Sequence, residues 1–216
     1  MSRYETNTGV EGEYELGSRK RVLKNLLGIC LKSEMDQTEH LAMVSAQTRY
    51  YTKNLVTKNT RFNAELIQKM HKDWLGSIYE WAGKYRTVEL EKDGFKWPPA
   101  YLIQDNMSAF ESYILSQHTP CRGKTIANVC DSIARVHAEL LLIHPFREGN
   151  GRIARWLVDL MAAQAGYPPP LYRFVGKGSK TEKIRYLSAV ISGYKKDYED
   201  LAGFFEDCIL LRLQAR

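Results

Sequence analysis

This sequence of 216 residues has only four cysteines and seven prolines, and it contains no internal repeat or low-complexity linker. Its cysteines, Cys30, Cys121, Cys130 and Cys208, lie far apart, and no pair has the C-x-x-C spacing of a zinc or redox motif. A disulfide framework needs more cysteines in a shorter chain. We therefore expect ordinary thiols in a reducing compartment.

Long apolar runs are also missing. The longest, Leu140–Ile143, is far below the roughly 20 residues that a membrane-spanning helix needs. Residues 1–9 are polar and lack the apolar segment of a secretory signal. We therefore expect no membrane partner and a cytoplasmic protein, unless other machinery delivers it into the cytoplasm of another cell.

The composition that is present is typical of one folded domain. Hydrophobic residues make up 44% of the chain and charged residues 26%, which excludes disorder as the main state. The chain has 31 Lys and Arg against 25 Asp and Glu, a net charge of +6. This surplus favours an anionic partner such as a nucleotide, a nucleic acid or an acidic protein, although a basic soluble surface explains it equally well.

Hydrophobic spacing predicts a mostly helical fold. The helical patterns cover residues 33–51, 62–79, 102–117, 125–143, 151–165, 179–192 and 198–213. Ser33 is the expected N-cap of the first helix, and Pro168–Pro170 excludes helix after the fifth. We expect an all-α fold with about seven to eight helices, in which residues 1–24 form an irregular lead-in and residues 25–216 form the domain.

Residues 85–97 have a different pattern. Polar and apolar residues alternate over Arg86–Leu90 and again over Phe95–Trp97, and Asp93-Gly94 between them is a strong turn dipeptide. This pattern predicts a β-hairpin that has no sheet to join. The outer edge of such a hairpin stays open to another chain.

The segment His-Pro-Phe-Arg-Glu-Gly-Asn-Gly-Arg-Ile-Ala-Arg, residues 144–155, concentrates groups that suit a polyphosphate. We expect His144 at the exit of a helix, because a residue before proline disfavours the α region. The glycines after Glu148 and the helix N-terminus that follows would present backbone N–H groups to an anion. Arg152 and Arg155 lie three residues apart on one helix face, and two guanidinium groups suit a polyphosphate.

Two titratable side chains complete this hypothesis. Glu148 is negative in a site for anions, which is explained if a divalent cation bridges it to phosphates. His144, with a reference pKa of about 6.5, is a natural acceptor for the proton of an attacking hydroxyl. Simpler explanations exist for two neighbours: Arg147 is expected to be solvated, and Arg155 could pair with Asp159 rather than with a ligand.

This segment resembles the signature of the Fic (filamentation induced by cyclic AMP) family, H-P-F-x-[D/E]-G-N-G-R-x-x-R, and it matches every fixed position. Residues 81–86, Trp-Ala-Gly-Lys-Tyr-Arg, resemble the W-A-G-x-x-R element before the family's flap, and the 85–97 hairpin stands where that flap does. The resemblance spans roughly residues 25–211. It implies the Fic fold, a helical domain with one β-hairpin flap.

The resemblance also implies an adenylyltransferase, which moves AMP from ATP to a Ser, Thr or Tyr hydroxyl of a target protein and releases pyrophosphate. His144 would be the catalytic base, Glu148 would bind Mg²⁺, and Phe146 would anchor the loop. The phosphates would bind to Gly149, Asn150, Gly151, Arg152 and Arg155. The flap would dock the target by strand addition through Thr87, Val88, Glu89, Leu90, Phe95, Lys96 and Trp97.

Many Fic enzymes resemble each other in an inhibitory helix of pattern [S/T]-x-x-x-E-[G/N], whose Glu pairs with the second signature arginine. The one Ser or Thr with Glu four residues later is Thr87, in the hairpin, and Asn7–Gly12 is a near miss that begins with Asn. The chain therefore resembles the class in which a separate small antitoxin supplies the Glu, here to Arg155. That class comprises toxin–antitoxin modules and delivered effectors.

Other functions stay open from the sequence. Doc-like members have Lys at the position of Arg152 and phosphorylate their targets, so Arg152 favours AMP transfer over phosphoryl or other nucleotide transfer. A nucleic-acid-binding protein without catalysis would explain the run Arg19–Arg21, but no nucleic-acid-binding motif accompanies it, and a solvated helix start is the simpler interpretation. His137–Glu139 mimics a deaminase element without its P-C-x-x-C partner, so we expect His137 in the core. Residues 176–181 fail the Walker spacing.

Overall fold

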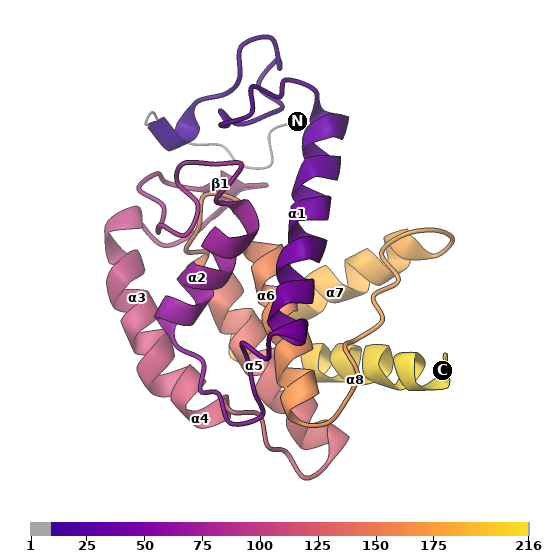
Figure 1. Cartoon of the computed structure of the whole chain (residues 1–216). Helices are drawn as coiled ribbons and strands as arrows, with labels where there is room; N and C mark the ends of the chain where they lie inside the picture. Colours follow the sequence, from indigo (N-terminus) through magenta and orange to yellow (C-terminus); the bar gives the residue numbers. More distant parts are fainter. Residues whose placement is uncertain (1–9, 216) are drawn as a thin grey trace. The chain divides into compact units, whose positions relative to one another are not determined.

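The computed structural model describes residues 10–215. In that part of the chain, helices α1 to α8 and one two-stranded hairpin form the regular structure, which confirms the expected all-α class with a hairpin (Figure 1). The described residues divide into two compact units. The first holds residues 10–55, 63–108 and 143–153, and the second holds residues 56–62, 109–142 and 154–215.

The first unit is built on α1, Lys32–Thr52, and α2, Ala64–Leu75, which lie side by side (Figure 1). Asn63 caps α2, because its side-chain oxygen accepts a hydrogen bond from the backbone N of Leu66 at 2.8 Å. The prediction that Ser33 caps α1 is wrong. Ser33 lies in the first turn of α1, whose N-cap position is Leu31 and has no side-chain cap.

The core of the first unit forms around the apolar face of α2. Fully or almost fully buried side chains are supplied by both helices and by the segment that follows α5; they are Ala46, Tyr50, Ile67, Met70, Trp74, Leu75, Phe146 and Ile153. Burial of each large apolar side chain stabilises the fold by roughly 1.5–3 kcal/mol. This core therefore provides a rigid base for the loop that carries the signature.

The lead-in is less irregular than expected. Val10–Gly12 form a 3-10 turn, η1, and Tyr14 forms an antiparallel bridge with Leu23. The basic run Arg19–Arg21 lies in the turn between them and is solvated, but it is not a helix start, because its first two residues have positive φ angles. Residues 1–9 of the lead-in lie outside the described residues.

The hairpin is shorter than the predicted 85–97. Its strands are β1, Glu91–Lys92, and β2, Phe95–Lys96, which pair antiparallel with Lys92 opposite Phe95. Asp93 and Gly94 form the turn, with φ angles of +51° and +80°. Residues 85–90 lie outside this ladder.

The second unit contains most of the remaining helices. The predicted helix over 102–117 is divided into four pieces: a 3-10 turn (Ala100–Leu102), helix α3 (Ile103–Phe110), a π-helical turn (Glu111–Leu115) and helix α4 (Ser116–His118). The boundary between the two units falls within α3. The other helices match their predicted ranges within two residues; they are α5, Ile126–Ile143, α6, Asn150–Gln164, α7, Ser179–Gly193, and α8, Glu199–Gln214.

In the second unit α7 packs against α8 (Figure 1). The buried core of this unit includes Leu115, Ile133, Trp156, Phe204 and Ile209. His137 is also buried here, as the sequence predicted. Across residues 10–215, no helix combines the length and apolar character needed to cross a membrane.

Candidate active site

His144 follows the last residue of α5 and precedes Pro145, as the sequence predicted. It is buried and adopts a φ angle of +53°, in the left-handed region. For a residue with a Cβ this conformation costs about 1–2 kcal/mol, and such strain persists where the surrounding structure enforces it. The imidazole packs against Trp97, with ring centres 4.2 Å apart.

Arg86 enforces this backbone from the stem of the flap. Its buried guanidinium donates hydrogen bonds to three carbonyl oxygens: Nε to His144 at 2.8 Å, Nη1 to Val88 at 2.8 Å and Nη2 to Pro98 at 2.6 Å. Its backbone N also donates to the Pro145 oxygen at 2.8 Å. The carbonyl of Val88 is thus bound to a side chain rather than to a neighbouring strand, which explains why the hairpin begins only after residue 90.

His71 of α2 supports the signature loop, and the sequence analysis missed it. Its Nδ1 accepts a hydrogen bond from Gly83 N at 2.8 Å, so Nε2 carries the proton and donates to the Glu148 carbonyl at 3.0 Å. Its ring stacks on the buried Phe146, with centres 3.9 Å apart. Burial lowers the pKa of His71 to about 4, so it is neutral at pH 7. A histidine within the apolar stripe of α2 was the available signal.

Asn150 closes the loop on itself. Its side-chain oxygen accepts from Phe146 N at 2.9 Å, and its Nδ2 donates to Phe146 O at 2.7 Å. Both polar atoms of the Asn150 side chain therefore bind the loop backbone, which leaves the backbone N–H of Asn150 as its group for contacting an anion. The backbone N–H groups of Asn150 and Gly151, the first two of α6, have no acceptor among the described residues. Such groups at a helix N-terminus favour an anion.

Gly149 is the position of the loop that requires glycine. Its φ is +86°, and a Cβ there would lie 2.7 Å from Cζ3 of Trp74. The loop therefore approaches the indole more closely than any side chain allows. The same indole lies below the guanidinium of Arg152, whose Cζ is 4.4 Å from the ring centre.

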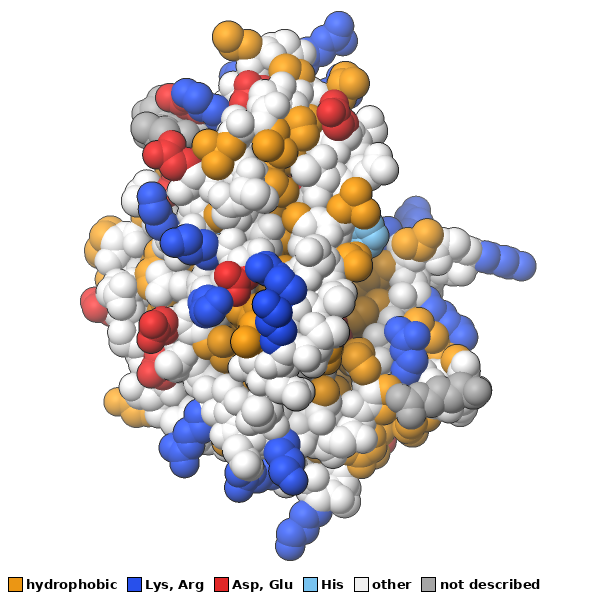
Figure 2. All heavy atoms as spheres, viewed as in Figure 1, with side chains coloured by type: hydrophobic (Ala, Val, Ile, Leu, Met, Phe, Trp, Pro, Cys, Tyr) orange, Lys and Arg blue, Asp and Glu red, His pale blue; other side chains and the backbone are white. Residues whose placement is uncertain are grey.

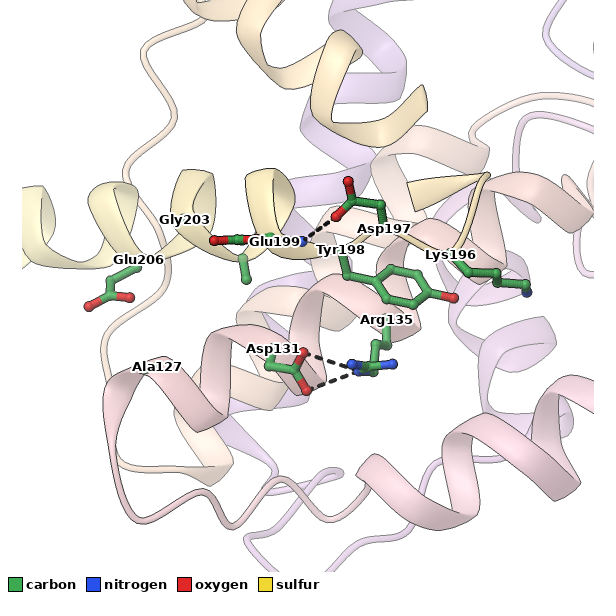
Figure 3. A pocket seen from close by; sticks show the side chains of 10 residues that line it. Ala127, Asp131, Arg135, Lys196, Asp197, Tyr198, Glu199, Gly203 and Glu206 are labelled. Carbon is green, nitrogen blue, oxygen red and sulfur yellow. Dashed lines mark hydrogen bonds and ion pairs between the residues drawn. The ribbon is translucent and has the colours of Figure 1, made fainter. Parts of the chain in front are cut away.

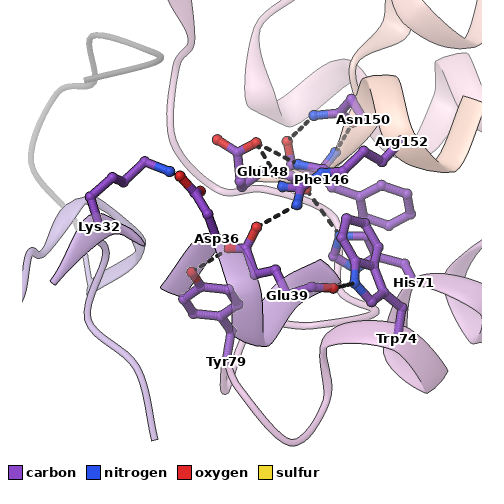
Figure 4. A network of polar contacts seen from close by, with 11 residues as sticks. Lys32, Asp36, Glu39, His71, Trp74, Tyr79, Phe146, Glu148, Asn150 and Arg152 are labelled. Atoms are coloured by element: carbon purple, nitrogen blue, oxygen red, sulfur yellow. Dashed lines mark hydrogen bonds and ion pairs between the residues drawn. The ribbon is translucent and has the colours of Figure 1, made fainter. Parts of the chain in front are cut away.

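Arg152 lies between two carboxylates (Figure 4). Its Nη1 forms an ion pair with Glu39 of α1, and its Nη2 is 3.4 Å from Oε1 of Glu148. Oε1 of Glu148 also accepts from Gly149 N at 3.0 Å. Glu39 and Trp74 are absent from the sequence-based site, because the helical pattern assigns Trp74 to the core and gives no reason to single out Glu39.

Glu148 is the acid of the signature, and it is buried. Among residues 10–215, no group of three or more His, Cys, Asp and Glu side chains could hold a metal ion. One carboxylate beside an anion site is nevertheless the donor set that Mg²⁺ uses with substrate phosphates, because this ion retains water and phosphate ligands. The residues present therefore fit Mg²⁺ delivered with a polyphosphate.

Arg155 belongs to the second unit, where its Cζ is 5.8 Å from the ring centre of Phe174. Among the described residues it forms no ion pair with Asp159, the alternative partner considered from the sequence. Burial instead raises the pKa of Asp159 to about 7. His137 is fully buried and bonds the hydroxyl of Tyr186 at 2.8 Å.

The prediction of a solvated Arg147 is wrong, since this residue is only 2% exposed. Its Nε donates to the carbonyl of Glu11 at 2.7 Å, because η1 packs against the signature loop within the first unit. The carboxylate of Glu11, the acid of the near miss to the inhibitory pattern, accepts from Thr87 N at 3.0 Å. Glu11 is thus engaged with the stem of the flap.

The flap residues differ in what they present to solvent. Val88 and Leu90 are buried, whereas Phe95 is 40% exposed and Lys96 is exposed. The backbone N of Trp97 donates to the Leu90 carbonyl at 3.1 Å and closes the hairpin. The side chains of Val88 and Leu90 are therefore not accessible to another chain, whereas those of Thr87, Glu89, Phe95 and Lys96 are exposed.

The second unit also has a pocket of about 480 Å³ beside α5 and α8 (Figure 3). Both basic side chains that line it are paired with acids: Arg135 Nε bonds both oxygens of Asp131 at 2.9 and 3.1 Å, and Lys196 pairs with Glu139 at 2.6 Å. None of the signature residues lines it. We therefore find no reason to assign the chemistry to this pocket.

The basic surplus does not gather into one stripe on the face shown in Figure 2. Lys and Arg side chains are spread there singly and in small groups among polar and apolar ones. A nucleic-acid interface typically has basic residues clustered on one face or along one helix. This face therefore gives no support to nucleic-acid binding.

Comparison with known proteins identifies the family. The Fic/DOC family model matches residues 61–162. Protein adenylyltransferase VbhT of Bartonella schoenbuchensis is 30% identical over 167 residues, which make up 77% of this chain and 33% of that protein. Protein adenylyltransferase Fic of Nematostella vectensis is 27% identical over 172 residues, 79% of this chain and 39% of that protein. The chain thus spans well under half the length of these curated relatives.

Solved structures show the same fold. The N-terminal Fic domain of a Bartonella effector protein (Bep) from Bartonella sp. AR 15-3 has a TM-score of 0.74 and 20% identity, covering 94% of this chain and 93% of that one. BepC of Bartonella tribocorum with bound AMPPNP has a TM-score of 0.69 and 21% identity, covering 86% and 91%. With its complete signature loop and the family match, this chain belongs to the Fic/DOC family and has the Fic fold.

Proposed function

We propose that this protein transfers AMP from ATP to a Ser, Thr or Tyr hydroxyl of a target protein. The observation that carries the proposal is the signature loop, in which a strained histidine, one carboxylate and two backbone N–H donors lie within eight residues. Its support comes from relatives named protein adenylyltransferase and from the AMPPNP held by BepC, which has the same fold.

In this proposal His144 is the general base. It accepts the proton of the target hydroxyl while the hydroxyl oxygen attacks the α-phosphorus, and the bond from that phosphorus to the β-bridging oxygen breaks to release pyrophosphate. The bond from Arg86 to its carbonyl and the packing of Trp97 on its ring hold the imidazole in one orientation. A base positioned in this way contributes about 10²–10⁴-fold to the rate.

The phosphates bind at the start of α6. The backbone N–H groups of Asn150 and Gly151 donate to phosphate oxygens. The close packing of Gly149 on Trp74, which fixes the loop just before these two residues, supports this role. Arg152 contributes the guanidinium edge that its carboxylate partners leave open, and Arg155, three residues later in α6, takes the terminal phosphate. Glu148 and the phosphates would hold Mg²⁺, which supplies charge neutralisation when bound.

Two macromolecular partners belong to the proposal. A target segment adds as a strand to the flap, which the exposed Phe95 and Lys96 of β2 support. A small antitoxin supplies a Glu to Arg155 and holds the enzyme inactive, as in a toxin–antitoxin module. The protein acts in cytoplasm, of its own cell or of one into which it is delivered; the Bep proteins of similar fold are described as VirB-translocated effectors.

The test is incubation of the purified chain with Mg²⁺, a cell lysate and ATP labelled at either the α- or the γ-phosphate, with His144→Ala as the control. We expect protein bands that carry the α-label, carry no γ-label and are absent with His144→Ala. Transfer of the γ-label would indicate phosphorylation and overturn AMP transfer. Equal labelling by His144→Ala would overturn the role of the base.

A further inference from the structure

The two acids that pair with Arg152 come from distant parts of the sequence (Figure 4). Glu148 lies four residues before Arg152, in the loop that leads into α6. Glu39 comes from α1, and its ion pair with Arg152 is the closer of the two. The arginine is therefore drawn to the acid from the other helix rather than to its near neighbour in sequence.

Glu39 is fixed in position. Its side chain is 5% exposed, and its Oε1 accepts a hydrogen bond from the Tyr79 hydroxyl at 2.7 Å. Its backbone carbonyl accepts from Nε1 of Trp74 at 2.9 Å. Burial and the neighbouring carboxylate raise the pKa of Tyr79 above its usual value, so its hydroxyl remains protonated and donates at all ordinary pH values.

Arg152 is therefore held on two sides and open on a third. Glu39 binds one terminal nitrogen, and the Trp74 ring covers one face of the planar guanidinium at 4.4 Å. A guanidinium has five N–H donors in a rigid fork, so donors remain on the 24% of this side chain that is exposed. The contact with Glu148, at 3.4 Å, is the weakest of the three.

We propose that Glu39 is a positioning residue that draws Arg152 away from Glu148 and thereby sets the divalent-cation requirement for nucleotide binding. Without the Glu39 charge, Arg152 would pair fully with Glu148, because its Nη2 already lies 3.4 Å from Oε1 of that residue and no other acid among residues 10–215 is paired with it. That pair would occupy a carboxylate oxygen and add a positive charge beside it, and both effects oppose binding of a cation. The inference rests on the proposed function, in which Glu148 takes Mg²⁺.

The test measures ATP binding by calorimetry at increasing Mg²⁺ concentrations, using the purified full chain. Glu39→Gln keeps the size of the side chain and its acceptor for Tyr79 but removes the charge. We expect it to raise the Mg²⁺ concentration for half-maximal binding by roughly tenfold or more, because a unit positive charge beside the carboxylate opposes the cation even in a partly hydrated site. Glu34→Gln, the same change at an exposed position in the first turn of α1, is the matched control and should leave this concentration unchanged.

A second variant keeps the test decisive if Glu39→Gln does not fold. Tyr79→Phe retains the charge of Glu39 and removes only its hydroxyl anchor, so we expect a smaller rise in the Mg²⁺ requirement. A shift no larger than that of Glu34→Gln, or a lower Mg²⁺ requirement in Glu39→Gln, would overturn the inference. If the unaltered protein binds ATP equally well without Mg²⁺, the role proposed for Glu148 fails instead, and the inference fails with it.

Discussion

Replacing Gly149 by alanine tests whether the signature loop depends on its close contact with the core. The Cβ of Gly149→Ala would lie 2.7 Å from Cζ3 and 3.0 Å from Cη2 of Trp74. The indole cannot move aside at low cost, since it is buried and its Nε1 donates to the Glu39 carbonyl at 2.9 Å. The new methyl group would therefore push the loop away from α2.

The size of the effect has two parts. The φ of +86° costs a residue with a Cβ about 1–2 kcal/mol, and overpacking in a closed core adds about 1–3 kcal/mol. We therefore expect Gly149→Ala to lower the free energy of unfolding by about 2–5 kcal/mol. Because the Trp74 ring also supports Arg152, we expect weaker ATP binding in the same variant.

Gly94→Ala separates the two contributions within the same unit. Gly94 has a φ of +80°, but a Cβ there would meet no atom within 4 Å, so this variant carries the backbone strain alone. Urea unfolding of both variants should give a larger loss for Gly149→Ala, by about 1–3 kcal/mol. Equal losses in the two variants would show that the close approach to Trp74 does not matter.

Three further predictions concern the loop and the histidine that supports it. The pKa of His71 is about 4 in the folded protein and about 6.5 in the unfolded chain, so the free energy of unfolding is highest above pH 6.5 and falls by about 3 kcal/mol as the pH drops to 4. In His71→Gln, urea unfolding measured at several pH values should lose this fall. The same pH dependence in the variant would contradict the prediction. Asn150→Ala leaves buried Phe146 N and O unpaired and should cost about 2–4 kcal/mol in urea unfolding, whereas the exposed Asn128→Ala should cost under about 1 kcal/mol. His144→Gly should have a higher urea midpoint than His144→Ala, with a free energy of unfolding greater by about 1 kcal/mol, because glycine relieves the strain at φ +53°. Equal midpoints would argue against strain.

Regular helices and the signature loop were predictable from the sequence, because each depends on local patterns. The apolar period identified α5 to α8 within two residues, and the glycines and proline of residues 144–151 marked a helix exit and a helix start. These features follow from the preferences of neighbouring residues in the chain. They needed no knowledge of what packs against them.

The supporting residues could not be predicted, because their roles depend on contacts between distant segments. His71 faces the loop only because α2 packs below residues 146–149, and helix periodicity alone treats it as one more core residue. Arg86 shortens the hairpin by binding the Val88 carbonyl, and Glu11 buries Arg147 from a position 136 residues away in sequence. Side-chain direction at such contacts is set by tertiary packing, which single-sequence patterns do not encode.

The central claim is that the signature loop binds Mg²⁺-ATP and that His144 removes the proton from the target hydroxyl. One preparation of His144→Ala tests it directly, by ATP titration calorimetry and by transfer of the α-phosphate label measured side by side with the unaltered protein. The account predicts ATP affinity within about threefold of the original and transfer slower by about 10²–10⁴-fold. Transfer at the original rate, or loss of ATP binding in a variant that remains folded, would contradict it.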